Sequence, residues 1–161
     1  MRHVQKLESE NTLEQHSNGT EVRQADYFAL ASFRYALRSF LAFSQQRAKE
    51  AGLTPQQHQS LLAIKGFSGE KGLSVTDLAT YMLLKHHSAV ELVDRLEKAD
   101  LVIRVPDSDD RRFIRLALTP KAESKLVALS ARHLIEIGRN APHLIDVLGH
   151  LSAENRKHSS K

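Results

Sequence analysis

The sequence predicts a mainly α-helical protein with one small β-hairpin, and three observations support that prediction. Apolar residues recur at three- and four-residue steps through most of the chain, as in helices with one buried face. Residues 113–118 instead alternate in character, as a half-buried strand does. Helix-start signals occur at Thr54, Ser74 and Thr119, each a hydroxyl residue followed by a proline or by a capping partner three positions on.

The composition fits one globular domain. The chain has 161 residues, of which 41% are hydrophobic and 26% are charged, and it contains no cysteine. Disulfides, thiolate zinc sites and cysteine-based redox sensing are therefore excluded. No apolar run approaches the roughly 20 residues that cross a bilayer, and residues 1–21 lack the apolar segment of a secretory signal. We therefore expect a cytoplasmic protein that does not contact a membrane.

The net charge of +4 is spread unevenly along the chain. Residues 1–26 carry −2, residues 27–84 carry +3, residues 85–115 carry 0 and residues 116–161 carry +3. The total favours binding to a polyanion only weakly. Any case for a nucleic-acid partner must therefore come from where the cations lie.

The N-terminal part divides into an arm and a long helix. Residues 1–22 hold few large apolar side chains in no helical period, and we expect a mobile arm there. From about Asp26 an apolar stripe follows a helical period and stops before Gly52, a typical neighbour of a helix C-terminus. The stripe consists of Leu30, Phe33, Leu37, Phe40 and Leu41.

The second helix begins with a capping box. Thr54 is the N-cap, Pro55 suits the first helical position, and Gln57 can bond back to the start of the helix. The glycine-rich residues 66–72 end it. We expect its buried side to consist of Leu61, Leu62 and Ile64.

Two further helices follow in quick succession. Ser74 and Asp77 form another capping box, and the short helix that they start is expected to end near Met82. After a tight turn, a longer helix is expected from about His86 to Ala99. Its buried stripe consists of Ala89, Leu92, Val93 and Leu96.

Two strands and two helices complete the chain. Residues 101–105 and 113–118 are expected to pair as a hairpin with a polar tip at residues 107–112. A fifth helix should start at Thr119 and stop at residues 138–140, and a last helix should open at Pro142. The polar tail, residues 152–161, is expected to fray.

The order helix, helix, helix, hairpin over residues 54–118 is the layout of a winged helix-turn-helix lobe. A helix fits the major groove of DNA, where side chains of its first turns meet base edges. An arginine on a narrow hairpin can enter the minor groove, where the potential is most negative. The layout therefore favours double-stranded DNA as the partner.

Three segments resemble the MarR family of bacterial regulators. They are residues 73–79 (LSVTDLA), residues 92–102 (LVDRLEKADLV), and the run 110–112 (DRR) followed at the family's spacing by Leu118 and Thr119. The resemblance covers about residues 27–151 and is strongest through residues 73–120. The chain departs from the family's pattern in having Leu83 and Leu84 for its usual Gly and Val, His86 and His87 for its small hydroxyl or basic residues, and Asp100 for a Gly.

The resemblance implies a set of DNA-binding residues. Arg112 would reach the minor groove, Asp110 would orient it, and Arg111 and Arg95 would meet phosphates. The helix that starts near His86 would read the DNA bases, and we call it the reading helix. Its front would comprise Lys85, His86, His87 and Ser88, with Val90 and Glu91 one turn on.

The resemblance also implies an assembly and a mode of action. Family members dimerise through their first and last helices, here residues 23–53 and 119–151, so a homodimer would bind a pseudo-palindromic operator as a repressor. A small aromatic effector in a cleft between lobe and dimer helices would release the DNA. The alternative is a winged-helix protein-interaction module without DNA binding, which the zero net charge of residues 85–115 favours.

Metal binding and catalysis find little support in the sequence. His86 and His87 are adjacent and point about 100° apart on a helix, so one ion rarely takes both. His143 and His150 could share a helix face, which leaves a metal-responsive regulator as a third class, but they have no carboxylate partner. Nucleophile-elbow, phosphate-loop and zinc-protease motifs are absent. We therefore expect no enzyme, no cofactor and no metal.

Overall fold

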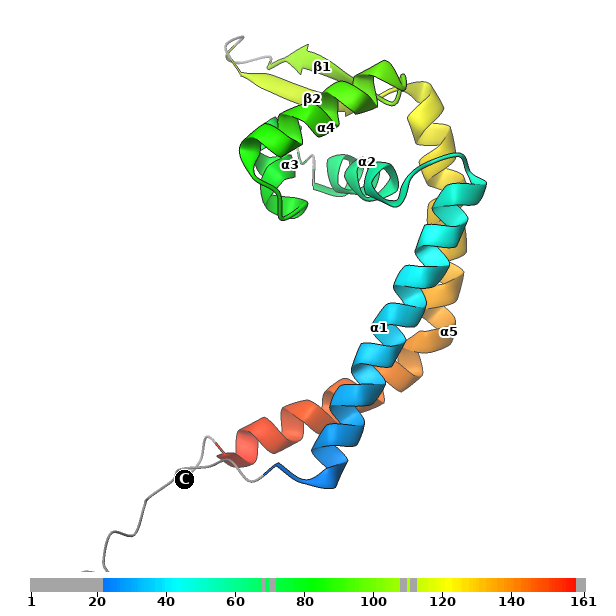
Figure 1. Ribbon diagram of the computed structural model, residues 1–161, viewed down its shortest axis with the longest axis vertical. Helices are drawn as coiled ribbons and strands as arrows, with labels where there is room; N and C mark the ends of the chain where they lie inside the picture. Colours follow the sequence, from blue (N-terminus) through cyan, green and yellow to red (C-terminus); the bar gives the residue numbers. More distant parts are fainter. Residues whose placement is uncertain (1–21, 68, 70–71, 108–109, 111–112, 159–161) are drawn as a thin grey trace, which may run out of the picture.

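The computed structural model describes residues 22–67, 69, 72–107, 110 and 113–158. It consists of a compact lobe and a pair of long helices that lie side by side, as Figure 1 shows. The long helices are α1 (Gln24–Glu50) and α5 (Pro120–His158). The lobe holds α2 (Pro55–Phe67), α3 (Val75–Tyr81), α4 (His86–Lys98), β1 (Val102–Pro106) and β2 (Ile114–Leu118). The predicted arm lies outside the described residues, apart from Val22.

The predicted helix starts are present. The Thr54 N–H donates to Gln57 Oε1 at 2.9 Å, and the Gln57 N–H donates to Thr54 Oγ1 at 3.1 Å. The same reciprocal pair joins Ser74 and Asp77 at the start of α3. Hydrogen bonds from the Ser74 side chain and backbone lower the pKa of the Asp77 carboxyl. Both capping boxes therefore fix where the lobe's helices begin.

The lobe core is built on α4, whose predicted buried stripe is confirmed. The prediction for α2 was partly wrong: Leu61 and Ile64 are buried, but Leu62 is 49% exposed. Consecutive residues lie about 100° apart around a helix, so the neighbour of a central core residue lies at the edge of the buried face. The largest fully buried apolar side chains are Leu61, Ile64, Leu78, Leu92, Val93, Leu96 and Val102.

The hairpin is joined to the helices through the segment before α3. β1 and β2 pair antiparallel, with Val102 opposite Leu118. The Leu116 N–H donates to the Leu73 carbonyl at 2.7 Å, which adds an isolated bridge to the sheet. Leu73 and Leu116 are both buried, so this bridge fixes the sheet against the core.

The predicted pair of C-terminal helices was wrong in one respect. α5 is continuous from Pro120 to His158 and includes Pro142. Figure 1 shows that α5 changes direction in its orange-to-red part instead of stopping there. A proline inside a helix removes one backbone hydrogen bond and bends the helix, but packed flanking turns can retain their helical form. The helix also continues past Ser152, where the sequence predicted fraying.

A buried histidine pair, which the sequence analysis did not single out, joins the lobe to the long helices. The rings of His58 on α2 and His133 on α5 lie 4.8 Å apart, and both residues are buried. His133 Nδ1 lies 2.7 Å from the Leu129 carbonyl, and Nε2 lies 2.9 Å from the Ser44 hydroxyl of α1. A carbonyl only accepts, so Nδ1 donates to Leu129, whereas a hydroxyl can donate or accept, so the Nε2–Ser44 bond can run in either direction. Two rings of α1 pack edge-on against His133, those of Phe40 and Phe43.

This junction is expected to make the protein less stable in acid. Burial, and secondarily the neighbouring His133, lower the pKa of His58. The unfolded chain then binds more protons than the folded chain between the folded pKa and about 6.5, the unfolded value. The contribution of neutral His58 to the free energy of unfolding is therefore complete above about pH 6.5, and it is lost as the pH falls through the pKa of the folded state. Urea denaturation of wild type and His58→Gln at a series of pH values tests this: an equal acid dependence in both would contradict it.

Candidate nucleic-acid interface

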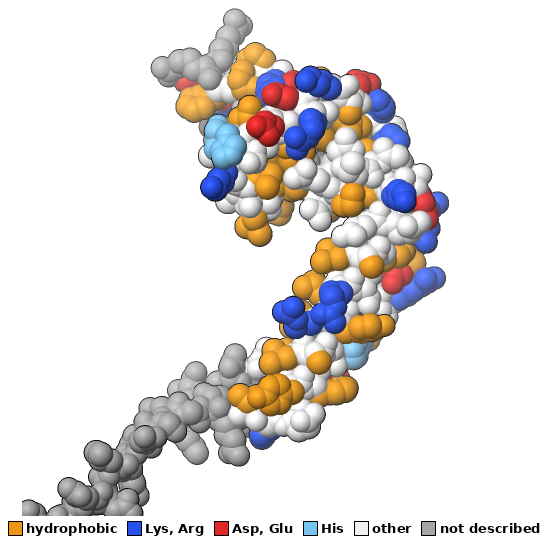
Figure 2. All heavy atoms as spheres, in the orientation of Figure 1, with side chains coloured by type: hydrophobic (Ala, Val, Ile, Leu, Met, Phe, Trp, Pro, Cys, Tyr) orange, Lys and Arg blue, Asp and Glu red, His pale blue; other side chains and the backbone are white. Residues whose placement is uncertain are grey.

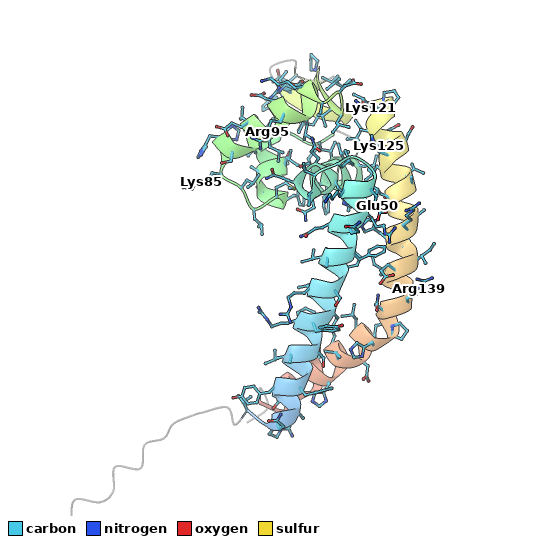
Figure 3. The ribbon with its side chains drawn as sticks, turned by 45° about the vertical axis from the view of Figure 1, so that its right-hand side comes forward. Glu50, Lys85, Arg95, Lys121, Lys125 and Arg139 are labelled. Carbon is cyan, nitrogen blue, oxygen red and sulfur yellow. The ribbon has the colours of Figure 1, made fainter. Side chains whose placement is uncertain are left out.

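The first turn of α4 faces away from the long helices. Its N-cap Lys85 and the next residues His86 and His87 are exposed, as are Glu91 and Arg95 further along. Figure 3 shows the side chains of Lys85 and Arg95 on the outer side of the lobe. Behind this surface, the buried stripe of α4 holds the helix on the core. The predicted reading residues therefore lie together on one accessible surface, with Ser88 and Val90 partly buried at its edge.

The electrostatics of this end of α4 suit an anion. Lys85 makes no side-chain cap to the helix, so the first N–H groups of α4 have no side-chain acceptor from that residue. These groups form the positive end of the helix dipole. Lys85 adds a charge at the same end, and His86 lies 3.5 Å from the Thr76 hydroxyl of α3. The arrangement can receive the phosphates and base edges of a DNA groove.

The turn between α3 and α4 holds an unusual leucine. Leu83 has φ +54° and is 92% exposed. The left-handed region costs a residue with a Cβ about 1–2 kcal/mol, which explains why the family resemblance places a glycine there. Asp100, which also stands where the family has glycine, has φ +55° at the end of α4. Both residues therefore adopt the left-handed conformation that glycine tolerates best.

The hairpin is attached to α4 through Arg104. Its guanidinium bonds to Asp94 Oδ1 at 2.7 Å and also pairs with the Glu97 carboxylate. The backbone N–H of Arg104 donates to Glu97 as well. The two carboxylates of α4 thus occupy this arginine and fix β1 against the reading helix.

A second ion pair lies at the base of the hairpin loop. Arg115 Nε donates to Asp107 Oδ2 at 2.7 Å, and the Asp107 side chain is only 6% exposed. The sequence analysis did not identify either residue as functional. Of the predicted wing residues, Asp110 is partly buried, whereas Arg111 and Arg112 lie outside the described residues. Their roles stay predictions.

Two recesses lie on the surface of the protein, one beside α4 and one beside α1. One, of about 660 Å³, lies between α3, α4 and β2, and its walls include Thr76, His86, Arg104 and Arg115. The other, of about 630 Å³, lies where α1 meets the start of α2. Its lining is mixed: Ala42, Gln45, Gln46, Lys49, Gly52, Leu53, Thr54, Pro55 and Gln57.

Comparison with known proteins points to one family. Residues 51–112 match the family model described as the MarR family, from the turn before α2 into the hairpin but short of β2. Over this part the chain is similar to the MarR family. This match confirms the resemblance given above, and the mainly α fold with a two-stranded hairpin agrees with solved MarR structures.

Curated relatives named as regulators of transcription match at moderate identity. The transcriptional activatory protein BadR of Rhodopseudomonas palustris is 34% identical over 104 residues, which are 64% of this chain and 54% of BadR. The transcriptional repressor MdtR of Bacillus subtilis is 31% identical over 77 residues, 48% of each protein. The chain thus spans about half the length of these relatives. They are regulators of transcription, not enzymes.

Solved MarR-family structures share the fold over most of the chain. AbsC of Streptomyces coelicolor superposes with a TM-score of 0.63 at 18% identity, covering 86% of this chain and 99% of AbsC. The DNA complex of MepR from Staphylococcus aureus gives a TM-score of 0.58 at 17% identity, covering 88% of this chain and 98% of MepR. At these identities the likeness establishes the fold alone.

Two searches of the described part of the chain bear on other functions. No three His, Asp or Glu side chains gather there in a way that could hold a metal ion. Among its helices, none combines the length and the apolar character of a membrane span.

Proposed function

We propose that this protein is a homodimeric transcription regulator of the MarR family that binds a pseudo-palindromic operator and represses transcription from it. The observation that carries the proposal is the accessible first turn of α4, which lies beside a hairpin fixed to the same helix. Two such helices related by a two-fold axis would meet half-sites about 10 base pairs apart. A protein with this task works where the chromosome lies, so we place it in the cytoplasm.

In this proposal the reading helix supplies both base and phosphate contacts. Lys85, His86 and His87 are exposed on its first turn and would reach base edges. Ser88, Val90 and Glu91 would complete this surface, and Arg95 would meet a phosphate. Because the side chains of Ser88 and Val90 are partly buried, we expect them to shape the surface more than to extend from it.

The hairpin would contact the adjacent minor groove. Arg104 and Arg115 are bound to carboxylates of the lobe and are therefore poor candidates for phosphate contacts. We assign the minor-groove contact to Arg112, a phosphate contact to Arg111 and the orientation of Arg112 to Asp110. These assignments rest on the family resemblance of the run at residues 110–112.

The long helices would form the dimer, and a small aromatic effector would act between them and the lobe. The recess where α1 meets α2 touches both parts of the protein. A ligand bound there could favour a lobe spacing that does not fit the operator, which lowers DNA affinity by population shift.

Replacing Arg112 by alanine is expected to weaken operator binding by about tenfold to a hundredfold, since the variant loses one groove contact. Titration of labelled operator, selected beforehand from a random pool, measures the affinity, and circular dichroism checks folding. Arg139→Ala is the matched control, because Arg139 is an exposed arginine on α5 below the lobe (Figure 3). An unchanged affinity of a folded Arg112→Ala would refute the wing assignment.

The alternative is a winged-helix module that binds a protein in place of DNA. The neutrality of residues 85–115 favours it, and the ion pairs of Arg104 and Arg115 reduce the cationic surface further. A mobility shift on random DNA at low salt separates the two. A DNA-binding regulator must retard such DNA and must lose affinity steeply as salt rises, whereas an interaction module need not.

A further inference from the structure

We propose that Asp107, at the base of the hairpin loop, is a positioning residue for DNA binding. Its carboxylate holds the two ends of the loop together and, through Arg115, fixes the hairpin to the start of α3. The sequence analysis gave the orienting role to Asp110 alone. This inference rests on the proposed function, since it concerns how the hairpin meets DNA.

The contacts of Asp107 close the loop from several directions. Its Oδ2 accepts from Arg115 Nε at 2.7 Å, and its Oδ1 accepts from the Asp110 N–H at 3.3 Å. Its own N–H donates to the Phe113 carbonyl at 2.9 Å, and the Phe113 N–H donates to the backbone carbonyl of Asp110 at 2.9 Å. A carboxylate this deeply buried is costly unless it is paired, so its bonds to both ends of the loop are expected to persist.

Arg115 extends this connection to the start of α3. Gly72 precedes α3 at φ +76°, and a Cβ on it would lie 3.4 Å from Arg115 Cβ, so the backbone lies directly against this side chain. The neighbouring Leu73 carbonyl accepts from the Leu116 N–H. The positive charge of Arg115 also contributes to lowering the pKa of Asp77, the capping residue of α3. Arg115 thus connects the hairpin base to the capping box.

The two arginines of the hairpin therefore have separate tasks. Arg104 fixes β1 to α4, which sets where the strands lie. Asp107 and Arg115 fix the end of the hairpin where the strands meet the loop. Without the Asp107 charge, the strands would stay paired to α4, but this end of the hairpin would be held less firmly and would have to be fixed when DNA binds. That ordering entropy would reduce affinity and weaken the hairpin contact.

The test is operator binding by Asp107→Asn at several salt concentrations. Asparagine keeps the shape and the acceptor for the Asp110 N–H but removes the charge that holds Arg115. We expect about tenfold weaker binding, and a salt slope less negative by about one, as for the loss of one phosphate contact. Because Asp107→Asn also releases the cation of Arg115, Arg115→Gln, which releases none, shows whether that cation offsets the change. A merely structural defect would lower the folded fraction and hence the affinity at every salt concentration, without changing the slope.

Two further variants make the outcome decisive. Asp100→Asn is the control, because Asp100 is 72% exposed and pairs with Lys121 away from the loop; its affinity and slope should be those of wild type. Arg115→Gln removes the arginine that pairs with Asp107 and should give the same loss of affinity and the same change in salt slope. This variant replaces Asp107→Asn in the test if Asp107→Asn fails to fold. An unchanged slope in both folded variants would overturn the proposal. Failure of the proposed function would look different, because wild type itself would then retard no DNA.

Discussion

Replacing Ile145 by arginine is expected to produce a monomer that binds the operator at least about 100-fold more weakly than wild type. Ile145 is 69% exposed in the single chain and lies on α5 beyond Pro142. Figure 2 shows apolar side chains gathered over the lower part of the long helices. The exposed large apolar side chains of α1 and α5 are Tyr27, Phe28, Leu30, Tyr35, Leu37, Leu41, Val127, Leu134, Ile135, Ile137, Ile145 and Leu148.

The expected size of this effect follows from bivalency. So many exposed apolar side chains on the two long helices of a small protein indicate an interface, and a two-fold dimer would bury them on both copies. When one lobe of a dimer binds its half-site, the second lobe is held at a high effective concentration, which adds a factor of about 10²–10⁴ in affinity. An arginine in the interface places an unpaired charge there and removes this advantage.

The matched control is His143→Arg on the same stretch of α5. His143 is exposed, and its position lies about 160° around the helix from that of Ile145, so it is on the opposite side of α5. Analytical ultracentrifugation gives the oligomeric state, and titration of labelled operator gives the affinity. The dimer proposal fails if wild type sediments as a monomer, or if Ile145→Arg remains a dimer with wild-type affinity.

The lobe could be predicted from the sequence because its signals are local. The capping boxes at Thr54 and Ser74 each depend on residues three positions apart, and the stripe of α4 repeats within one helix. Leu83 and Asp100 stand where the family resemblance has glycine, and both have the positive φ that glycine adopts most readily. The accessible surface at the front of α4 follows directly, because it is the face opposite the stripe.

The features that the sequence did not reveal depend on distant partners. His133 meets His58 across three helices, and its Nε2 bonds to Ser44, 89 positions away. Asp107 and Arg115 belong to different strand ends, and each looks like a surface charge in the sequence. No local pattern distinguishes such residues from solvated ones. The continuity of α5 through Pro142 was missed because a proline signals a helix start as well as a bend.

Replacing Leu61 by alanine is expected to lower the free energy of unfolding by about 2–5 kcal/mol, whereas the same change at Leu62 should cost less than about 1 kcal/mol. The two leucines are adjacent on α2, and the sequence predicted both as buried. In the structure Leu61 is fully buried and Leu62 is 49% exposed. Truncating Leu61 leaves a cavity behind the reading helix, while truncating Leu62 mainly removes a side chain from water.

The pair of variants isolates burial from every other property. Both carry one Leu→Ala change in the middle of the same helix, so helix propensity and the effect on the unfolded chain are nearly identical. Urea denaturation at fixed protein concentration measures the difference, since the stability of a dimer depends on concentration. Equal losses in the two variants would mean that Leu62 is covered in the native assembly. Leu62 lines a recess of the lobe together with Phe67, Tyr81 and Leu83. Equal losses would therefore mean that a second protein chain covers this recess in the native assembly.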